Sequence, residues 1–287
     1  MSRYPKISAY KRFAGWLLLF SLLLAAAYAL LPAAAPAPDD APAEAGQPPY
    51  VTALAGVVID AHSGQALQSI NADMQLPPAS TGKVLTALLT LDLCADLQRQ
   101  TLVSTAAAAV GDSSMGLVAG EIISVEHLLY GALLHSGNDA CYALAEATLG
   151  SEPFFVWLLN IKAQAIGAQH SNFTNTNGLP DDEHYSSAAD LAQITRHALN
   201  NDFFAATVAS KYMGFGSESN YRYYQNTNKL LWQDEHIVGV KTGTTNAAGP
   251  CLIAAYRDGE RLYIAVALNS ADRYGDCYRL LCYAAAK

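Results

Sequence analysis

Strand-like sequence lies at both ends of the folded part of this chain, with helix-like sequence between, and this order limits the folds open to it. Short apolar runs bounded by turn residues predict strands, and apolar residues at helical spacing predict helices. The predicted strands are 53–60, 66–70, 239–241, 252–256 and 262–268; the predicted helices are 80–93, 125–134, 139–149, 188–199 and 273–285. The order indicates an α+β fold in which both chain ends contribute to one sheet and a helical insertion separates them.

The first 49 residues have the sequence of a membrane segment followed by a spacer. Residues 13–31 are almost continuously apolar, and four basic residues precede them. This run is long enough to span a bilayer, and the basic residues before it place the rest of the chain outside the cytoplasm. We therefore expect an uncleaved anchor or a cleaved signal in residues 1–31, a Pro/Ala-rich linker in residues 32–49 and a folded domain in residues 50–287.

Charge and cysteine content exclude two classes of function. After the four N-terminal basic residues, the chain carries 13 basic and 25 acidic residues, a net charge of −12. Such a domain is a poor candidate for binding nucleic acid, whose phosphates need Lys and Arg. The five cysteines show no spacing typical of a zinc site, and we expect them to be small buried thiols. The predicted function therefore involves no metal and no cofactor.

Ser80 and Lys83 form the first candidate catalytic pair. They open the predicted helix 80–93 directly after two prolines. Residues i and i+3 share a helix face, so the amine of Lys83 can reach the hydroxyl of Ser80. A serine needs a base to become a nucleophile, and a lysine serves as one only when burial or a nearby cation lowers its pKa. The start of a buried helix provides that desolvation.

Two further motifs follow this pair in the chain. S-G-N at residues 136–138 lies in the connection between two predicted helices, and K-T-G at residues 241–243 lies on a predicted strand. S-x-x-K, S-x-N and K-T-G in this order are the signature set of serine β-lactamases and penicillin-binding proteins. The three motifs together predict acyl transfer through a serine nucleophile.

Over residues 55–285 the chain resembles the low-molecular-mass penicillin-binding proteins of the D-alanyl-D-alanine carboxypeptidase type. The matching stretches are AGVVIDAHSGQAL, LPPASTGKVLTALL, LLYGALLHSGNDACYALAE, FTNTNGLPDDEHYSSAADLA, NTNKLL and VGVKTGTTNAAGPCLIAA. The resemblance implies the two-lobed serine β-lactamase/transpeptidase-like fold, an antiparallel sheet with flanking helices plus an all-helical lobe. It also implies removal of the terminal D-alanine from peptidoglycan stem peptides, and acylation by β-lactams.

The resemblance assigns the catalytic roles. Ser80 would be the acylated nucleophile, Lys83 its base, and Ser136 the relay that passes a proton to the leaving D-alanine. The backbone N–H groups of Ser80 and Thr244 would form the oxyanion hole, the largest electrostatic contribution in such acyl transfers.

The resemblance also assigns the substrate-binding residues. Asn138 would bind the substrate amide, Lys241 would supply positive charge, and Thr242 would bind the terminal carboxylate. Gly243 completes the K-T-G motif of this binding strand. Arg273 either steers the carboxylate or is a solvated arginine at the start of the helix 273–285.

Three alternative functions share the same motifs. A class A β-lactamase needs a glutamate in an E-x-x-L-N pattern after S-x-N, and the nearest match, residues 156–160, has Val156 in its place. This favours a slow acyl-enzyme over rapid drug hydrolysis. The intact polar positions disfavour a catalytically silent β-lactam sensor. A D,D-endopeptidase uses the same chemistry on cross-links, and the sequence leaves it open.

Overall fold

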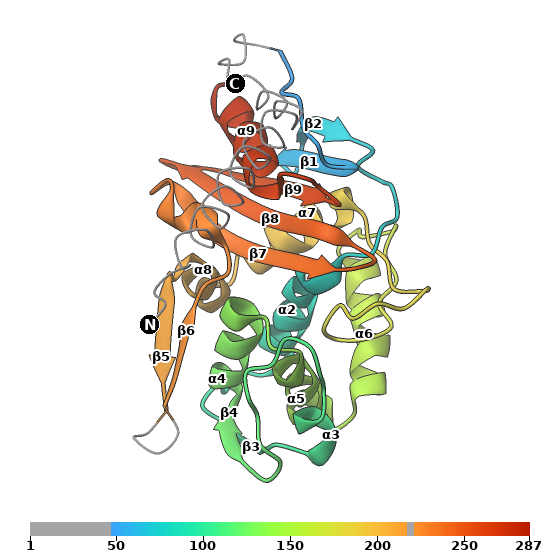
Figure 1. Cartoon of the computed structure of the whole chain (residues 1–287), viewed down its shortest axis with the longest axis vertical. Helices are drawn as coiled ribbons and strands as arrows, with labels where there is room; N and C mark the ends of the chain where they lie inside the picture. Colours follow the sequence, from blue (N-terminus) through green and yellow to red (C-terminus); the bar gives the residue numbers. More distant parts are fainter. Residues whose placement is uncertain (1–46, 217–220) are drawn as a thin grey trace, which may run out of the picture. The chain divides into compact units, whose positions relative to one another are not determined.

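The computed structural model describes residues 47–216 and 221–287. At its centre is a five-stranded antiparallel sheet with the strand order β2-β1-β9-β8-β7 (Figure 1). The strands are β1 (Ala55–Asp60), β2 (Ala66–Ile70), β7 (Ile237–Thr245), β8 (Gly249–Asp258) and β9 (Arg261–Leu268). Because β1 pairs with β9, the prediction that both chain ends contribute to one sheet is confirmed.

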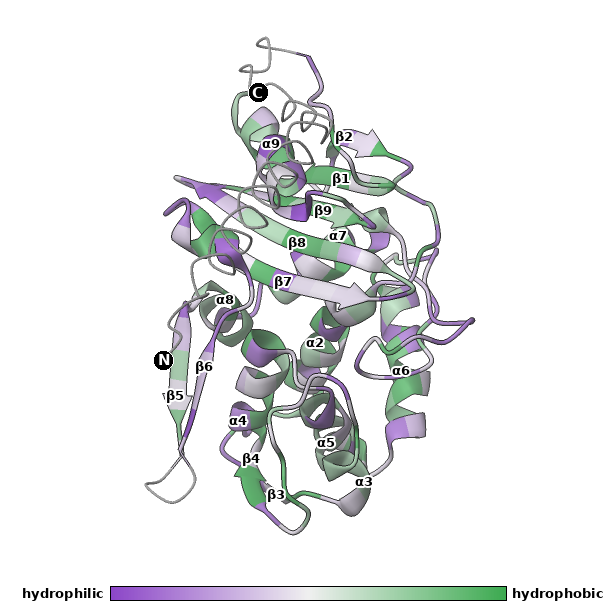
Figure 2. Ribbon diagram, in the orientation of Figure 1, coloured by the Kyte–Doolittle hydropathy of each residue, from purple (hydrophilic) through white to green (hydrophobic). Residues whose placement is uncertain are grey.

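Helices cover both faces of this sheet, which explains why its central strands are apolar throughout. The buried leucines of α9 (Arg273–Ala285) pack with Val58 and Leu252 on one face. On the other face lie α7 (Ala188–Ala198) and α8 (Asp202–Ala209). Figure 2 shows the corresponding hydrophobic colouring along β1, β8 and β9. Strands buried on both faces lose the polar–apolar alternation of a half-exposed strand.

The section of chain between β2 and α7 forms the helical lobe. Its elements are η1 (Ala79–Gly82), α2 (Lys83–Leu93), α3 (Thr105–Ala108), α4 (Val125–Tyr130), η2 (Gly131–His135), α5 (Asn138–Leu149) and α6 (Glu152–Ala165). The same section also contains a small antiparallel pair of strands, β3 (Gln100–Leu102) and β4 (Ile122–Ser124). The expectation of an all-helical lobe is therefore not fully met. The predicted α+β class and the antiparallel sheet with flanking helices are confirmed.

Several elements differ from the sequence-based expectations. The predicted helix 80–93 begins as the 3₁₀ turn η1, and the predicted helix 125–134 ends in the π-helix η2. The helices α6 and α8 were not predicted. A two-stranded ribbon of β5 (Tyr212–Phe215) and β6 (Arg222–Gln225), followed by η3 (Lys229–Trp232), was not predicted either.

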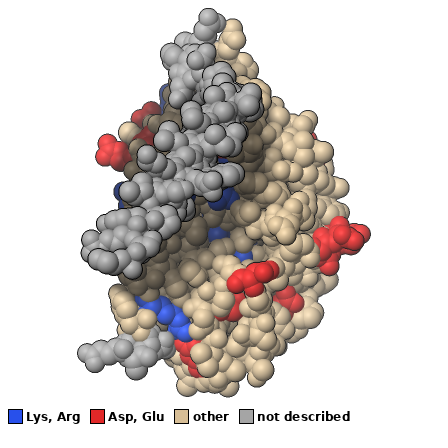
Figure 3. All heavy atoms as spheres, in the orientation of Figure 1, with Lys and Arg blue, Asp and Glu red and all other residues tan. Residues whose placement is uncertain are grey.

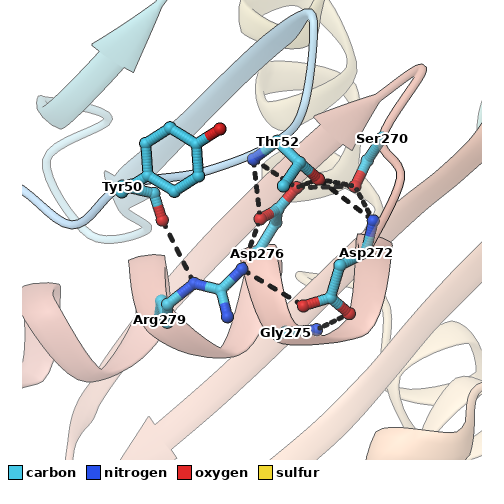
Figure 4. A network of polar contacts seen from close by, with 7 residues as sticks. All are labelled: Tyr50, Thr52, Ser270, Asp272, Gly275, Asp276 and Arg279. Atoms are coloured by element: carbon cyan, nitrogen blue, oxygen red, sulfur yellow. Dashed lines mark hydrogen bonds and ion pairs between the residues drawn. The ribbon is translucent and has the colours of Figure 1, made fainter. Parts of the chain in front are cut away.

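The start of the described chain is tied to the last helix. The backbone N–H of Thr52 donates to both carboxylate oxygens of Asp276, at 2.9 and 3.0 Å, and its hydroxyl donates at 2.8 Å (Figure 4). Arg279 donates to the carbonyl of Tyr50 at 3.1 Å and to Asp276 at 2.6 Å. Burial alone would raise the pKa of Asp276. The hydrogen bonds from Ser270, Thr52 and Arg279 outweigh this effect and lower the pKa below its usual value.

The expected anchor or signal in residues 1–31 lies outside the described residues, as does most of the linker. Within the described part of the chain, no helix has the length and apolar character needed to cross a membrane.

All five cysteines are free thiols. Cys94, Cys141, Cys251 and Cys277 are buried, as expected from the sequence, whereas Cys282 is exposed. The expectation of five buried thiols is therefore wrong for Cys282, which lies on the solvent side of α9.

Candidate active site

Ser80 and Lys83 lie side by side where η1 passes into α2. Lys83 Nζ donates a hydrogen bond to Ser80 Oγ at 2.7 Å. Side chains at i and i+3 eclipse one another in a 3₁₀ turn, so η1 brings the pair together as well as an α-helix would. Ser80 is half-buried and Lys83 is fully buried. The hydroxyl can therefore meet a ligand while the amine is shielded from water.

Lys83 makes two more hydrogen bonds, both to groups that can only accept. Its Nζ donates to Asn138 Oδ1 at 2.8 Å and to the backbone carbonyl of Asn177 at 2.5 Å. Burial lowers the pKa of Lys83 to about 8, although the nearby Cys141 and Asp139 oppose that shift. A substantial fraction of Lys83 is therefore a neutral amine at mildly alkaline pH.

The S-G-N motif forms a sharp connection between η2 and α5. Ser136 has φ 66° and ψ 30°, a left-handed conformation, and is almost completely buried. Asn138 begins α5, and its Nδ2 donates to the carbonyl of Gly111 at 2.9 Å. Its backbone N–H donates to the carbonyl of Ser113 at 2.7 Å. Both bonds attach the motif to the loop at residues 111–113.

The backbone carbonyl of Asn177 is a site contact that sequence reasoning missed. It belongs to a loop that passes close to η1, and this approach requires the glycine that follows. Gly178 has φ +87°, and a Cβ there would lie 2.0 Å from the carbonyl oxygen of Ala79. The one available signal was T-N-G-L-P within a stretch that matched the family, because a carbonyl contact leaves no side-chain pattern.

The K-T-G motif lies on β7, at the edge of the sheet. A Cβ on Gly243 would lie 2.9 Å from the backbone nitrogen of Ser80, so the absence of a side chain allows β7 and η1 to approach closely. Lys241 is buried, and its Nζ donates to the carbonyl of Thr242 at 3.0 Å. Burial and the charge of Lys83 lower the pKa of Lys241 well below its usual value.

Arg273 reaches the K-T-G strand from the start of α9. Its Nη1 donates to Thr244 Oγ1 at 2.7 Å and to the carbonyl of Gly243 at 2.9 Å. It is thus held against this strand.

A cleft of about 340 Å³ opens in front of Ser80. Its walls are the loop containing residues 112–113, the loop 177–180, the end of β7 with residues 244–246, and Asn138. Among the sequence-predicted residues, Ser80, Asn138 and Thr244 line the cleft. Lys83 lies behind Ser80, to which its amine is hydrogen-bonded. Figure 3 shows Lys and Arg side chains near the middle of one face of the molecule, with acidic side chains below them, at the right-hand edge and at the upper left.

Known proteins share this sequence and fold. The family model described as D-alanyl-D-alanine carboxypeptidase matches residues 42–272. The D-alanyl-D-alanine carboxypeptidase DacD of Salmonella typhimurium is 35% identical over 249 residues, which cover 82% of this chain and 63% of the relative. DacF of Bacillus subtilis is 32% identical over 76% of this chain and 58% of its own length. The chain thus spans about three fifths of these two relatives.

Three further matches cover most of the similar protein's own length. DacB2 of Mycobacterium tuberculosis is 36% identical over 77% of both chains. The crystal structure of a D-alanyl-D-alanine carboxypeptidase from the same organism superposes with a TM-score of 0.80 at 32% identity, covering 87% of this chain and 97% of that one. The Streptomyces K15 DD-transpeptidase superposes with a TM-score of 0.78 at 28% identity, over 84% and 100%. From the family match and these identities, the chain belongs to the D-alanyl-D-alanine carboxypeptidase family of serine peptidases, S11.

Proposed function

We propose that this protein is a serine-type D-alanyl-D-alanine carboxypeptidase that removes the terminal D-alanine from peptidoglycan stem peptides through a Ser80 acyl-enzyme. The same serine takes up β-lactams covalently. The observation that carries the proposal is the environment of Lys83, whose buried amine has one partner that can donate a proton and two that cannot. Membership of the family supports the substrate class.

The hydrogen-bond inventory at Lys83 determines where its lone pair points. A neutral amine carries two hydrogens and one lone pair. Asn138 Oδ1 and the carbonyl of Asn177 can only accept, so they take the two hydrogens. The lone pair is then left for the remaining neighbour, the Ser80 hydroxyl at 2.7 Å. Deprotonated Lys83 is therefore oriented to accept the Ser80 proton.

Acylation then proceeds with Ser80 Oγ attacking the carbonyl carbon of the penultimate D-alanine while its proton passes to Lys83. The carbonyl oxygen becomes an oxyanion, which the N–H groups of Ser80 and Thr244 stabilise. The peptide C–N bond breaks as Ser136 gives its hydroxyl proton to the leaving nitrogen and receives in exchange the proton that Lys83 took from Ser80, and D-alanine departs. Water then attacks the ester, giving the shortened peptide and restoring the serine hydroxyl.

The K-T-G strand would hold the free end of the substrate. The terminal carboxylate would bind Thr242 and Arg273, with Lys241 close by. A carboxylate entering this region stabilises the protonated amine, so it would raise the depressed pKa of Lys241 and favour its charged form. Asn138 Nδ2 carries a second hydrogen besides the one given to Gly111, and that hydrogen can bind a substrate carbonyl.

The region expected to distinguish a class A β-lactamase supports slow turnover of penicillin. Val156 lies within α6 and is partly buried. Among the described residues that line the cleft, Asp112 is the acidic one and no glutamate is present. A penicillin adduct also keeps its leaving group tethered, which hinders water. We therefore place the carboxypeptidase ahead of the β-lactamase.

The proposal extends to the location of the protein. Residues 13–31 would anchor or export the chain, residues 32–49 would be a spacer, and residues 50–287 would form the extracytoplasmic catalytic domain. The basic residues before the apolar run support this orientation.

Two measurements on one preparation test the proposed function. Release of D-alanine from a stem pentapeptide is followed over many turnovers, and mass spectrometry measures acylation by benzylpenicillin. We expect D-alanine release, one drug per chain on Ser80, and an adduct that survives for minutes or longer. Ser80→Ala should remain folded and lose both reactions. Rapid penicillin turnover without D-alanine release would make the protein a β-lactamase, and a label that persists in Ser80→Ala would refute the site.

A further inference from the structure

Thr227 contacts the K-T-G motif from outside the three signature motifs. Its Oγ1 lies 2.6 Å from Thr242 Oγ1, a short hydroxyl–hydroxyl hydrogen bond in which either oxygen could be the donor. Thr227 lies between β6 and η3, in the sequence Asn226-Thr227-Asn228, and is partly buried. No role was predicted for it from the sequence.

The two flanking asparagines fix the backbone on which Thr227 stands. Asn226 Nδ2 donates to the carbonyls of Val208 and Ser210, each at 3.0 Å. Asn228 Nδ2 donates at 2.7 Å to the carbonyl of Gly239, which belongs to the same strand as Thr242. Both asparagines are buried, so their bonds hold this segment alongside β7 with little freedom to slide.

The start of α9 holds Thr227 from the other side. Tyr274 Oη donates to the carbonyl of Thr227 at 3.1 Å. The guanidinium of Arg273 lies 5.0 Å from the centre of the Tyr274 ring, and its Nη2 is 3.4 Å from the phenol oxygen. Thr227 is therefore connected to both groups proposed to bind the substrate carboxylate, Thr242 directly and Arg273 through Tyr274.

We propose that Thr227 is a positioning residue for carboxylate recognition, and this inference rests on the proposed function. A hydroxyl has one hydrogen, and a carboxylate can only accept. When Thr242 donates its hydrogen to the substrate carboxylate, its oxygen must accept the hydrogen of Thr227. Thr227 thereby fixes the direction in which Thr242 donates, giving a chain of donors that runs from Thr227 through Thr242 to the carboxylate.

The consequence is a defined effect on substrate binding. Thr227→Val keeps the shape of the side chain and removes the donor, which leaves the Thr242 hydroxyl without a fixed rotamer. The carboxylate is bound in both the ground state and the transition state, so the loss should appear in KM with kcat nearly unchanged. A single neutral hydrogen bond implies a rise of about threefold to tenfold in KM.

The experiment measures kcat and KM for D-alanine release from a stem pentapeptide by the full chain and six variants. Thr227→Val should raise KM, and Thr227→Ser, which keeps the hydroxyl, should restore it. Thr227→Ala repeats the loss should valine prevent folding. Thr242→Val and the double variant Thr227→Val/Thr242→Val complete a cycle, in which the double variant should equal Thr242→Val alone. Thr195→Val, which removes a hydroxyl bonded to Leu191 within α7, is the matched control and should match the wild type.

The outcomes separate the inference from the proposed function. An unchanged KM in Thr227→Val or Thr227→Ala, a Thr227→Ser variant as impaired as Thr227→Val, or additive effects in the cycle would overturn the inference alone. If wild-type protein is acylated by benzylpenicillin but releases no D-alanine, the same variants are compared by acylation rate, because penicillin also carries a carboxylate. A wild-type chain that is not acylated by benzylpenicillin and releases no D-alanine would overturn the proposed function itself.

Discussion

The side-chain oxygen of Asn138 lies 2.8 Å from Nζ of Lys83, 55 residues away in the chain, and this contact has only one workable orientation. Asn138 Nδ2 donates to the carbonyl of Gly111, so a flipped amide would place a donor against the Lys83 amine and an oxygen against a carbonyl. The loop at Gly111 therefore ensures that Lys83 meets an acceptor at Asn138. This is why its lone pair, once the proton has left, points to Ser80.

The first prediction is that acylation follows the deprotonation of Lys83. Its pKa is lowered to about 8 because burial disfavours the charged form. Below that pH most molecules carry an ammonium without a lone pair, so the rate constant for acylation by benzylpenicillin should rise with pH, with a midpoint near 8, and level off above it. Lys83→Met and Lys83→Arg should remain folded and unlabelled, the second because a guanidinium stays protonated. A rate independent of pH from about 6 to 10 would exclude Lys83 as the base.

The second prediction concerns Asn138→Asp. A carboxylate beside Lys83 stabilises the ammonium, so the pKa of Lys83 should rise and the acylation midpoint should move above 8. Each unit of that shift lowers the fraction of free base near neutral pH about tenfold. Asn160→Asp is the control, because Asn160 lies on α6 and its side chain bonds to the backbone of Phe173 rather than to Lys83. An unmoved midpoint in Asn138→Asp would argue against direct coupling of these two side chains.

The third prediction compares two glycines with nearly the same positive φ. Gly178 and Gly167 have φ of +87° and +86°, but a Cβ at Gly178 would meet Ala79, whereas nothing lies within 4 Å at Gly167. Gly167→Ala should cost about 1–2 kcal/mol of stability from strain and leave acylation unchanged. Gly178→Ala must also move the loop, which withdraws the Asn177 carbonyl from Lys83. Denaturant unfolding and acylation rates together should show that only Gly178→Ala slows acylation. If the two variants were acylated at the same rate, the close approach of Gly178 to Ala79 would have no role in the site.

The fourth prediction concerns how far the chain can be shortened from its N-terminal end before the folded domain loses stability. A chain that starts at Pro48 keeps Tyr50 and Thr52 and should be monodisperse and active. A chain that starts at Leu54 loses the N–H and O–H groups that Thr52 gives to the buried Asp276 carboxylate. Its free energy of unfolding should fall by about 1–3 kcal/mol or more, measured in urea. If the chain from Pro48 partitions into membranes, a second attachment surface exists. Equal stability of the two chains would show that the Thr52 bonds contribute little.

The sequence predicted the parts of the site that are side chains at regular spacing. Ser80 and Lys83 were paired from their i, i+3 spacing, and the pair survives the change from an α-helix to a 3₁₀ turn because both geometries bring these positions together. The carbonyl of Asn177 could not be predicted, because any residue type supplies one. The contact between Thr227 and Thr242 depends on how β7 lies against the segment after β6, which no local pattern records.

The helix α6 was not predicted for a different reason. Phe154, Trp157 and Ile161 are exposed, while Phe155 and Leu159 are buried, so apolar residues occur all round the helix. The clear one-sided periodicity that indicates an amphipathic helix is therefore weak. By contrast α9, which buries its leucines on one side, was predicted with the same bounds that the structure has.

The pairing of β1 with β9, and of Thr52 with Asp276 224 residues later, has a consequence for biosynthesis. One edge of β1 stays unsatisfied until nearly the last residue of the domain has been made, so the sheet cannot close around a partial chain. Contacts this distant in sequence slow folding, and an unpaired apolar strand invites association with other chains. A ribosome that stalls before β9 would therefore release a product with an unfinished sheet, open to proteolysis.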